Sequence, residues 1–213
     1  RKKYDPVQIN FGLSAGVNIP YADRGATFLS NPLQLNLELF KNEQHRLYTG
    51  LAFANLNYLL EGTSDPDKYA DEELQSFPEL YEEEFLPRRV TVNNRLWSIP
   101  VNYRYYDYLT NQWGLYLGGG LQLNMLSRQS FFYDYLDIKD GQLVEFDKKV
   151  VEDGTQLSIG YLNATFGIIY QIEDRINISA DVNYLHNLSP LGIENRRIHQ
   201  LGFQAGLQYR LRR

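Results

Sequence analysis

Apolar and polar residues alternate almost without interruption at both ends of the chain, and this alternation limits the fold more than any other feature. Residues 201–211 place Leu, Phe, Ala, Leu, Tyr and Leu on one face and Gly, Gln, Gly, Gln and Arg on the other, and residues 7–19 alternate in the same way. A period of two is that of a β-strand with one apolar and one polar face. A transmembrane β-barrel needs strands of about ten such residues, because lipid lies outside it and a polar lumen inside.

The same pattern recurs along the chain and predicts eight strands. In the third of them the pattern changes parity near Ala54–Asn55, which indicates a β-bulge. The predicted fold class is all-β: an eight-stranded antiparallel up-and-down transmembrane β-barrel that forms one domain over residues 1–213, after a lead-in at 1–6. The strands are expected at 7–20, 33–41, 46–60, 94–107, 112–127, 157–171, 175–187 and 198–211.

The connections between these strands alternate in length. Short ones at 42–45, 108–111 and 172–174 separate long ones at about 22–32, 61–93, 128–156 and 188–198. Outer-membrane barrels combine short periplasmic turns with long outer loops. The alternation therefore predicts the outer membrane of a Gram-negative bacterium, with the N-terminus and the C-terminus both periplasmic.

Composition narrows the remaining classes. No apolar run reaches the ~18 residues of a membrane helix, and the chain has no cysteine, so neither a disulfide nor a thiolate metal site can form. A net charge of -5 without a basic patch excludes nucleic acid as a partner. A chain that starts with Arg1 is expected to be processed or part of a longer one. A soluble lipocalin-type barrel also alternates, but its strands would carry lysines, whereas the lysines here fall in termini, turns and predicted loops.

Aromatic residues mark both ends of the apolar face, where amphipathic rings favour the membrane interface. The predicted belts are Tyr105, Trp113, Tyr170 and Tyr209 at the periplasmic side, and Tyr21, Tyr58, Trp97 and Tyr184 at the outer side.

Several segments resemble a known group of proteins. They are Phe11–Asn18, Ile99–Tyr105, Gly118–Leu121 and the closing Gly206–Leu211, which is similar to a C-terminal barrel-assembly signal. The chain resembles the eight-stranded outer-membrane β-barrel proteins common in Bacteroidota, which are distantly similar to OmpX and the OmpA barrel. The resemblance implies the architecture. It does not imply one function, because barrels of this group serve many tasks. The ending differs from the usual signal, since Arg212 and Arg213 follow Leu211.

Charged residues on the polar face are the first candidates for chemistry. An eight-stranded barrel is just wide enough for side chains to fill it, so these charges predict either an ion-paired plug or a gated path for protons or ions. Glycines on the same face are expected to leave room for the larger groups. The predicted lumen network is Glu38, Arg104, Asp181 and Arg210.

Two histidines near the outer rim are the only hint of catalysis. His186 and His199 lie on adjacent strands, and with Asp181 or Glu194 they would activate water or bind a metal. No serine or aspartate has a recognisable spacing to them. We therefore predict no enzyme activity, no metal site and no cofactor.

The long second and third loops carry aromatic residues among acidic ones. Such residues form either a solvated cap or a protein-binding surface, and Asp140-Gly141 predicts a hairpin that extends the sheet above the membrane. The predicted function is that of a structural or accessory subunit, or a loop-mediated binding protein, which docks to a larger envelope complex, with membrane lipid and other envelope proteins as partners. A narrow ion or small-solute channel and, less favoured, a hydrolase at the rim are the alternatives. The candidate partner-binding residues are Leu74, Phe77, Tyr81, Phe85, Phe131, Phe132, Tyr133 and Tyr135.

Overall fold

The computed structural model describes residues 7–22, 26–40, 42–61, 85–137, 145–190 and 197–211. These residues contain no helix, and hence none long and apolar enough to cross a membrane. The strands are β1 (Gln8–Ala22), β2 (Ala26–Thr27), β3 (Leu33–Phe40), β4 (His45–Glu61), β5 (Phe85–Tyr108), β6 (Trp113–Asp137), β7 (Glu145–Glu173), β8 (Ile176–Asn187) and β9 (Ile198–Leu211).

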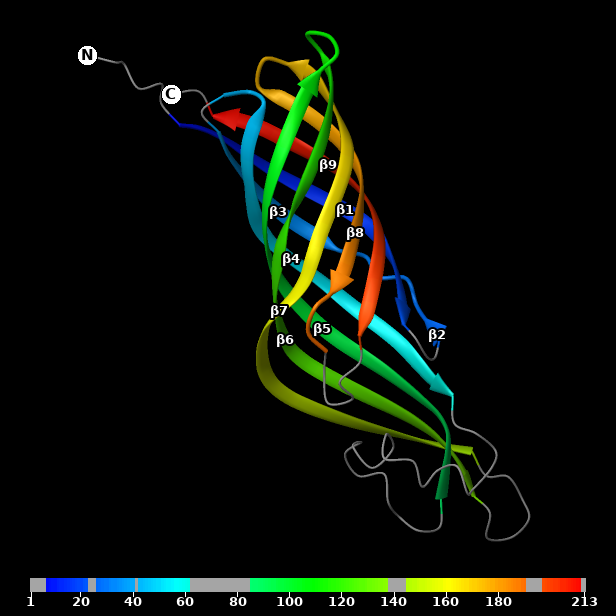
Figure 1. Ribbon diagram of the computed structural model, residues 1–213. Coiled ribbons are helices and arrows are strands. Elements are labelled where there is room, and N and C mark those ends of the chain that lie inside the picture. Colours follow the sequence, from blue (N-terminus) through cyan, green and yellow to red (C-terminus); the bar gives the residue numbers. More distant parts are fainter. Residues whose placement is uncertain are drawn as a thin grey trace.

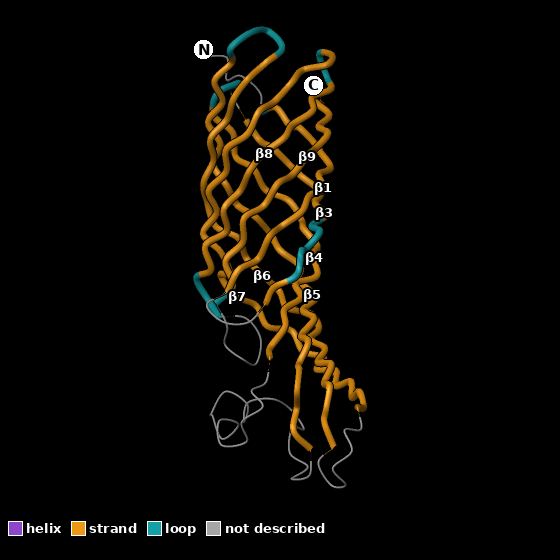
Figure 2. The backbone as a smooth tube through the Cα atoms, turned by 90° about the vertical axis from the view of Figure 1, so that its right-hand side faces the viewer, coloured by secondary structure: helices purple, strands orange, loops and turns teal. Residues whose placement is uncertain are grey.

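Eight of these strands close into an antiparallel barrel (Figures 1 and 2). Each barrel strand pairs with its neighbours in the chain, and β1 closes the ring against β9 from Ile9↔Leu211 to Ala22↔Ile198. The ninth strand, β2, has two residues and pairs with β4 at Tyr58 and Leu59. The predicted eight-stranded up-and-down antiparallel barrel is confirmed.

The two ends of the barrel differ in their connections. At one end lie the start of β1, the end of β9 and the short turns β3–β4, β5–β6 and β7–β8; we call it the short-turn end (Figure 1). The opposite end carries the longer connections and is called the long-loop end. Short and long connections alternate along the chain as predicted.

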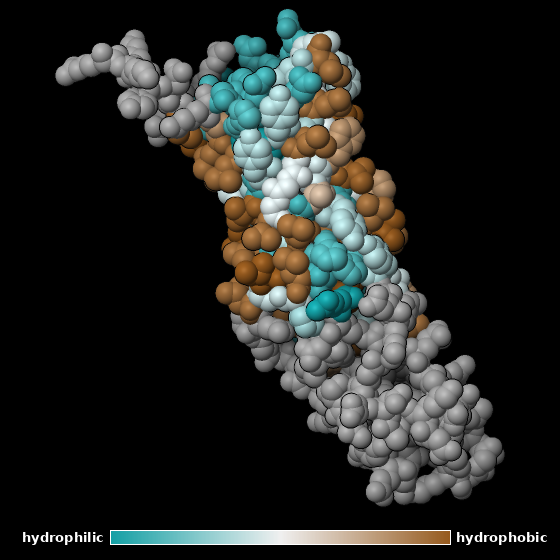
Figure 3. Space-filling view, in the orientation of Figure 1, coloured by the Kyte–Doolittle hydropathy of each residue, from teal (hydrophilic) through white to brown (hydrophobic). Residues whose placement is uncertain are grey.

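Side chains alternate between the lumen and the outer surface along every barrel strand. In β3, Leu33 and Leu35 are exposed while Gln34, Asn36 and Glu38 are buried. The barrel thus has its polar residues inside and its apolar residues outside, the reverse of a barrel in water. On the face shown in Figure 3, apolar side chains cover much of the wall, while hydrophilic ones gather at the short-turn end and in a second group lower on the same face.

Three strands are longer than the sequence pattern indicated. Residues 85–93, 128–137 and 145–156, expected in outer loops, belong to β5, β6 and β7. The pair Leu136↔Glu145 confirms the predicted hairpin, although its turn at Asp140-Gly141 lies outside the described residues.

Since β7 meets β8 only as far as Tyr161↔Asn187, four strands run past the barrel wall (Figures 1 and 2). We call this part, made of 54–61, 85–95, 128–137 and 145–156, the projecting sheet.

The projecting sheet reverses the polarity of the barrel wall at several positions, although Asn94 and Gln129 are buried on its inner surface and Phe132 is exposed on its outer surface. Asn55, Arg95 and Arg128 are exposed on its outer surface, while Leu56 and Val92 are buried on its inner surface. A change from apolar to aqueous surroundings at this level explains the reversal, because a sheet in water buries its apolar face.

Three predictions are corrected here. The expected bulge near Ala54–Asn55 is wrong, because β4 pairs with β5 in one register from His45↔Tyr105 to Glu61↔Arg89. The apolar residues change face there while the backbone does not shift. For the same reason Tyr58, predicted in the outer aromatic belt, points inward and is 2% exposed. Phe131, predicted on a partner-binding surface, is fully buried opposite Val92.

Candidate functional site in the barrel lumen

The buried carboxylate of Glu38 on β3 is the centre of the lumen near the short-turn end. It is 1% exposed and receives donors from three other strands. Arg46 Nη1 lies 3.0 Å from Oε2, and Arg104 Nη1 lies 3.3 Å from Oε1. The Tyr106 hydroxyl donates to Oε1 at 2.5 Å, and Asn10 Nδ2 donates to Oε2 at 3.2 Å. Four donors compensate the cost of burying this charge.

A second carboxylate extends the network to the turn between β3 and β4. Glu43 Oε2 accepts from Arg46 Nη2 at 3.2 Å. Arg210 of β9 binds both oxygens of Glu43, with distances of 3.1 and 3.0 Å. The paired charges therefore run Arg210, Glu43, Arg46, Glu38, Arg104 across the lumen, and β3, β4, β5 and β9 are tied together at this end.

Aromatic rings fill the space around the guanidinium groups. The Arg104 guanidinium carbon lies 3.4 Å from the ring centroid of Tyr48, and that of Arg46 lies 4.0 Å from the ring centroid of Tyr106. Such cation–π contacts gain strength where water is excluded. On the opposite wall Tyr116 donates to Asp181 Oδ2 at 2.7 Å. Charges, rings and hydrogen bonds together fill this end of the lumen. We call this set the lumen plug; its members are Glu38, Glu43, Arg46, Tyr48, Arg104, Tyr106, Tyr116, Asp181 and Arg210.

The large side chains of the lumen plug fit inside the barrel because the positions opposite them are glycines. A Cβ on Gly118 would lie 2.9 Å from Arg104 Cγ, and a Cβ on Gly167 would collide with the ring of Tyr116. The predicted packing role of the lumen glycines is confirmed at Gly118.

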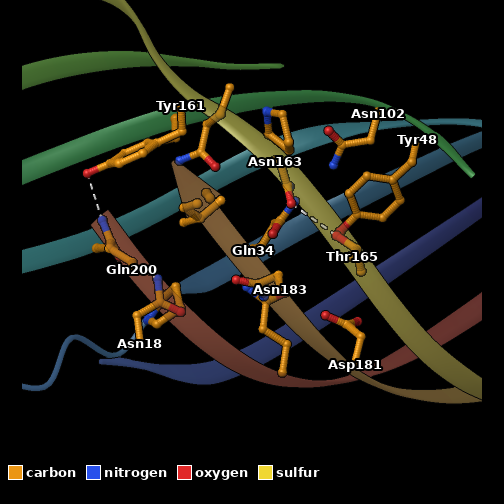
Figure 4. A pocket seen from close by; sticks show the side chains of 18 of the residues that line it. Asn18, Gln34, Tyr48, Asn102, Tyr161, Asn163, Thr165, Asp181, Asn183 and Gln200 are labelled. Carbon is orange, nitrogen blue, oxygen red and sulfur yellow. Dashed lines mark hydrogen bonds between the residues drawn. The ribbon is translucent and has the colours of Figure 1, made fainter. Parts of the chain in front are cut away.

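A small polar cavity lies between the plug and the long-loop end (Figure 4). Its volume is about 50 Å³, enough for roughly four water molecules. Buried amide atoms with no protein partner line it: Gln34 Nε2, Asn102 Oδ1 and Asn183 Oδ1. These atoms fit a site where ordered water completes the hydrogen bonds.

A chain of hydrogen bonds crosses the lumen on the far side of this cavity. Gln200 Nε2 donates to the Tyr161 hydroxyl at 2.8 Å, and Asn18 Nδ2 donates to Gln200 Oε1 at 2.7 Å. Buried apolar side chains, among them Leu56, Leu96 and Ile198, lie on the inner surface toward the long-loop end. The cavity is thus bounded by the lumen plug on one side and by an amide–phenol chain on the other.

The structure places all four predicted lumen residues on the inner face. Glu38 and Arg104 are in direct contact, Arg210 joins them through Glu43, and Asp181 is held on the opposite wall by Tyr116. Arg46 and Glu43 were not among the predicted lumen residues. The signal for Arg46 was present, because it alternates with the outward Leu47; nothing in the pattern marks a turn residue such as Glu43 as part of a lumen network.

The two rim histidines meet on the outer surface. The rings of His186 and His199 are 4.6 Å apart, with Tyr21 stacked on His199 at 5.4 Å. Asp181 faces the lumen and His186 faces outward on the same strand, so the suggested dyad between them does not form. Glu194 lies outside the described residues. Among the residues that are described, no group of three or more His, Asp or Glu side chains is arranged to hold a metal.

The other predicted aromatic and partner-binding residues divide by exposure. Seven of the eight belt residues, all except Tyr58, point outward and are exposed or half-exposed, and Trp113 and Tyr170 have ring centroids 4.5 Å apart. Phe132 is 39% exposed. Phe85, Tyr133 and Tyr135 lie in strands, but their side chains are not described. Leu74, Phe77 and Tyr81 lie outside the described residues.

Comparison with known proteins gives the class of fold. No family profile and no curated sequence matches this chain. The structure is similar in fold to solved outer-membrane barrels. Neisserial surface protein A has a TM-score of 0.53 at 12% identity, with 95% of this chain and 97% of that chain covered.

Two further solved structures of outer-membrane proteins have a similar fold. OprG from Pseudomonas aeruginosa has a TM-score of 0.52 at 14% identity, with 97% and 96% covered. A major outer membrane protein from Thermus thermophilus has 0.51 at 14%, with 96% and 99% covered. At these identities the likeness shows the fold alone: a closed eight-stranded barrel of the outer-membrane type.

Proposed function

We propose that this chain is an outer-membrane barrel that acts as an accessory or binding protein of the cell envelope, with its contacts on the projecting sheet and adjacent loops. It spans the outer membrane of a Gram-negative bacterium with both termini on the periplasmic side. An origin in Bacteroidota rests on the sequence resemblance of the strands. The observation that carries the proposal is the extension of β4–β7 beyond the barrel wall at the long-loop end.

The outer surface of the barrel supports the location. Outward leucines and aromatic rings, such as Leu35 at 61% exposed and Phe11 at 49%, would face water in a soluble protein at a high cost. A bilayer removes this cost, and the outward rings of Tyr105 and Tyr184 then lie at its two interfaces.

The closed lumen supports a function outside the barrel. Arg46, Glu38 and Arg104 bridge the interior in one continuous network, so passage of a solute would require breaking buried ion pairs. A barrel without an open path exposes only its surface and its loops to other molecules.

The projecting sheet offers a specific mode of contact. β7 from Glu145 to about Leu157 pairs with β6 on one side, and among the described residues no strand pairs with its other edge. An unpaired edge of some twelve residues is about 40 Å long and is a template for adding a strand from a partner. The sequence of this segment contains Asp147, Lys148, Lys149, Glu152 and Asp153, and charged residues in an edge strand oppose non-specific pairing.

Two deletions test this proposal. The first replaces residues 130–151 by Asn-Gly, a two-residue turn that joins Gln129 and Glu152, which pair directly. The second removes 64–82 from the connection between β4 and β5. Each variant and the intact chain are expressed in the native outer membrane, checked for heat-modifiable gel mobility, and purified in mild detergent with co-purifying proteins quantified.

We expect a stoichiometric partner with the intact chain and its loss with the first deletion. Loss of the partner with the second deletion alone would show that the partner binds the connection between β4 and β5 and not the projecting sheet. Equal recovery of the same partner with all three chains, or no partner with any, would contradict the proposal.

A narrow channel is the second candidate, because a polar cavity with unpartnered amide atoms lies in the lumen. This alternative requires the lumen plug to open. It predicts conductance in planar bilayers that changes with Arg104→Ala, whereas the binding proposal predicts a silent bilayer with the intact chain.

A further inference from the structure

Three alanines stand side by side on the outward surface of the barrel. Ala15 of β1 pairs with Ala205 of β9, which in turn pairs with Ala180 of β8. All three are exposed. Because neighbouring strands lie about 4.8 Å apart, the alanines form a low strip about 10 Å long where the surrounding outward residues are large.

Bulky side chains border this strip on both sides. The next outward row toward the short-turn end carries Leu13, Leu207 and Ile178, which pair with one another in the same order. The next row in the other direction carries Val17, Phe203 and Val182. These two rows are separated by four residues, or about 13 Å along the strands. The alanines are therefore the floor of a furrow, which we call the alanine furrow.

The border row continues across β7 to the aromatic belt, where Tyr170 lies beside Ile178. Ile168, which is 40% exposed, lies beside Ala180 and ends the low floor that the three alanines form. Trp113 packs on Tyr170 at the end of the border row. The hollow lined by the alanines, by the border row toward the short-turn end, and by Ile168, Tyr170 and Trp113 has a volume of about 540 Å³, within the range of pockets that hold small molecules. Among the residues that the structure describes, no charged side chain lines this hollow.

The two ends of the furrow lie at different membrane depths. Trp113 and Tyr170 lie at the short-turn end, where β6 begins and β7 nears its last residues. Ala15 is the middle of the outward apolar stretch of β1, which runs from Ile9 to Tyr21. The furrow thus leads from the membrane interface toward the centre of the bilayer.

We propose that the alanine furrow binds one acyl chain of a phospholipid whose headgroup lies beside Trp113 and Tyr170. The inference rests on the membrane location in the proposed function and goes beyond it. The indole and phenol groups suit the polar interface. The apolar floor suits a hydrocarbon chain, which gains van der Waals contacts in a hollow that straight neighbouring lipids would leave poorly packed.

A second copy of the barrel fits the furrow less well. Strands in such barrels tilt by about 35–45° from the axis, and the furrow runs at right angles to the strands. A copy related by a two-fold axis along the membrane normal would lay its own rows across the furrow at a large angle. Its ridges would touch the borders and leave the floor uncovered. A flexible chain has no such restriction.

Fluorescence quenching tests this binding. Of the two tryptophans, Trp97 is replaced by phenylalanine so that Trp113 reports alone. The folded protein in detergent micelles is titrated with a phosphatidylethanolamine brominated on one acyl chain. Ala205→Phe and, as a second filling variant, Ala180→Phe are compared with Ala164→Phe, an outward alanine of β7 that lies outside the furrow. Each is checked for heat-modifiable gel mobility and for its association state by sedimentation.

We expect saturable quenching that unbrominated lipid reverses. Ala205→Phe or Ala180→Phe should weaken it by about tenfold or more, since the phenyl ring removes many chain contacts, while Ala164→Phe should leave it unchanged. Quenching that is linear in lipid and equal in all variants would overturn the proposal. So would an oligomer that only the filling variants dissociate, because a second copy would then occupy the furrow. Neither result bears on the partner-binding test, which uses the opposite end of the molecule.

Discussion

Removing the carboxylate of Glu38 should destabilise the barrel more than any other single change in the lumen. Its two guanidinium partners are nearly inaccessible, with side chains 0% and 5% exposed. After Glu38→Ala, Arg46 keeps the carboxylate of Glu43, whereas Arg104 keeps the tyrosines Tyr48 and Tyr116, which carry no charge to balance its own. Breaking a buried ion pair from one side costs about 3–5 kcal/mol. We expect a loss of that size in the free energy of unfolding.

Three companion variants separate charge from packing. Glu38→Gln keeps the shape and one acceptor and should lose about 2–3 kcal/mol, the worth of hydrogen bonds to a charged group. Glu43→Ala removes a carboxylate that is 44% exposed and should cost at most about 1 kcal/mol. In the double variant Glu38→Ala with Arg104→Ala, the cost should fall below the sum of the single costs, because the orphaned guanidinium is gone.

The assay is reversible unfolding in guanidinium chloride from lipid vesicles, followed by tryptophan fluorescence. A loss of less than about 1 kcal/mol for Glu38→Ala, or a loss no larger than that of Glu43→Ala, would contradict a buried and fully paired carboxylate. Either result would mean that water reaches these charges and that the lumen is open at the plug.

Two further predictions use the same unfolding assay. Gly167→Leu should cost about 1–3 kcal/mol, because the larger side chain overpacks against the Tyr116 ring. The matched control is Gly119→Leu, which faces outward, where an added Cβ meets only Asn163 O at 3.5 Å. An equal loss of stability at both positions would be inconsistent with a packed lumen. Tyr116→Phe should cost about 1–3 kcal/mol by removing the donor to Asp181, and an unchanged midpoint would show that the bond contributes nothing.

Alternation along the strands was sufficient to predict the barrel, its eight strands and the side of each strand that faces the lumen. The pattern works because a membrane barrel separates polar from apolar residues at every second position, so Leu35 and Gln34 already indicate their faces. Glu38, Arg104, Asp181 and Arg210 were found in the same way.

The pattern failed where the surroundings change. Beyond Ala54 the outward face is polar and the inward face is apolar, so an uninterrupted strand looked like a bulge, and Tyr58 was assigned to the wrong face. Sequence alternation reports the contrast between two faces and not which face meets lipid. The lengths of β5, β6 and β7 were missed because charged residues such as Lys148 and Lys149 are typical of loops, whereas they lie within β7 and charged residues also occur in edge strands.

Contacts across the lumen were outside the reach of the pattern. Which charges meet depends on the register of strands far apart in sequence, as in Arg210 with Glu43. The alanine furrow has the same origin, because Ala15, Ala180 and Ala205 are ordinary small residues until the pairing places them in one row.

The most direct test of the account replaces Leu117 by arginine and measures the free energy of unfolding from lipid vesicles. Leu117 is outward and 61% exposed. It pairs with Phe166 on the neighbouring strand β7, which in turn pairs with Val182 on β8. If this surface meets the bilayer core, Leu117→Arg should cost about 2–4 kcal/mol, and Asn55→Arg on the outer surface of the projecting sheet about 0–1 kcal/mol. If both changes are within about 0.5 kcal/mol of the intact chain, as expected of a surface in water, the protein is not a membrane barrel and the account is contradicted.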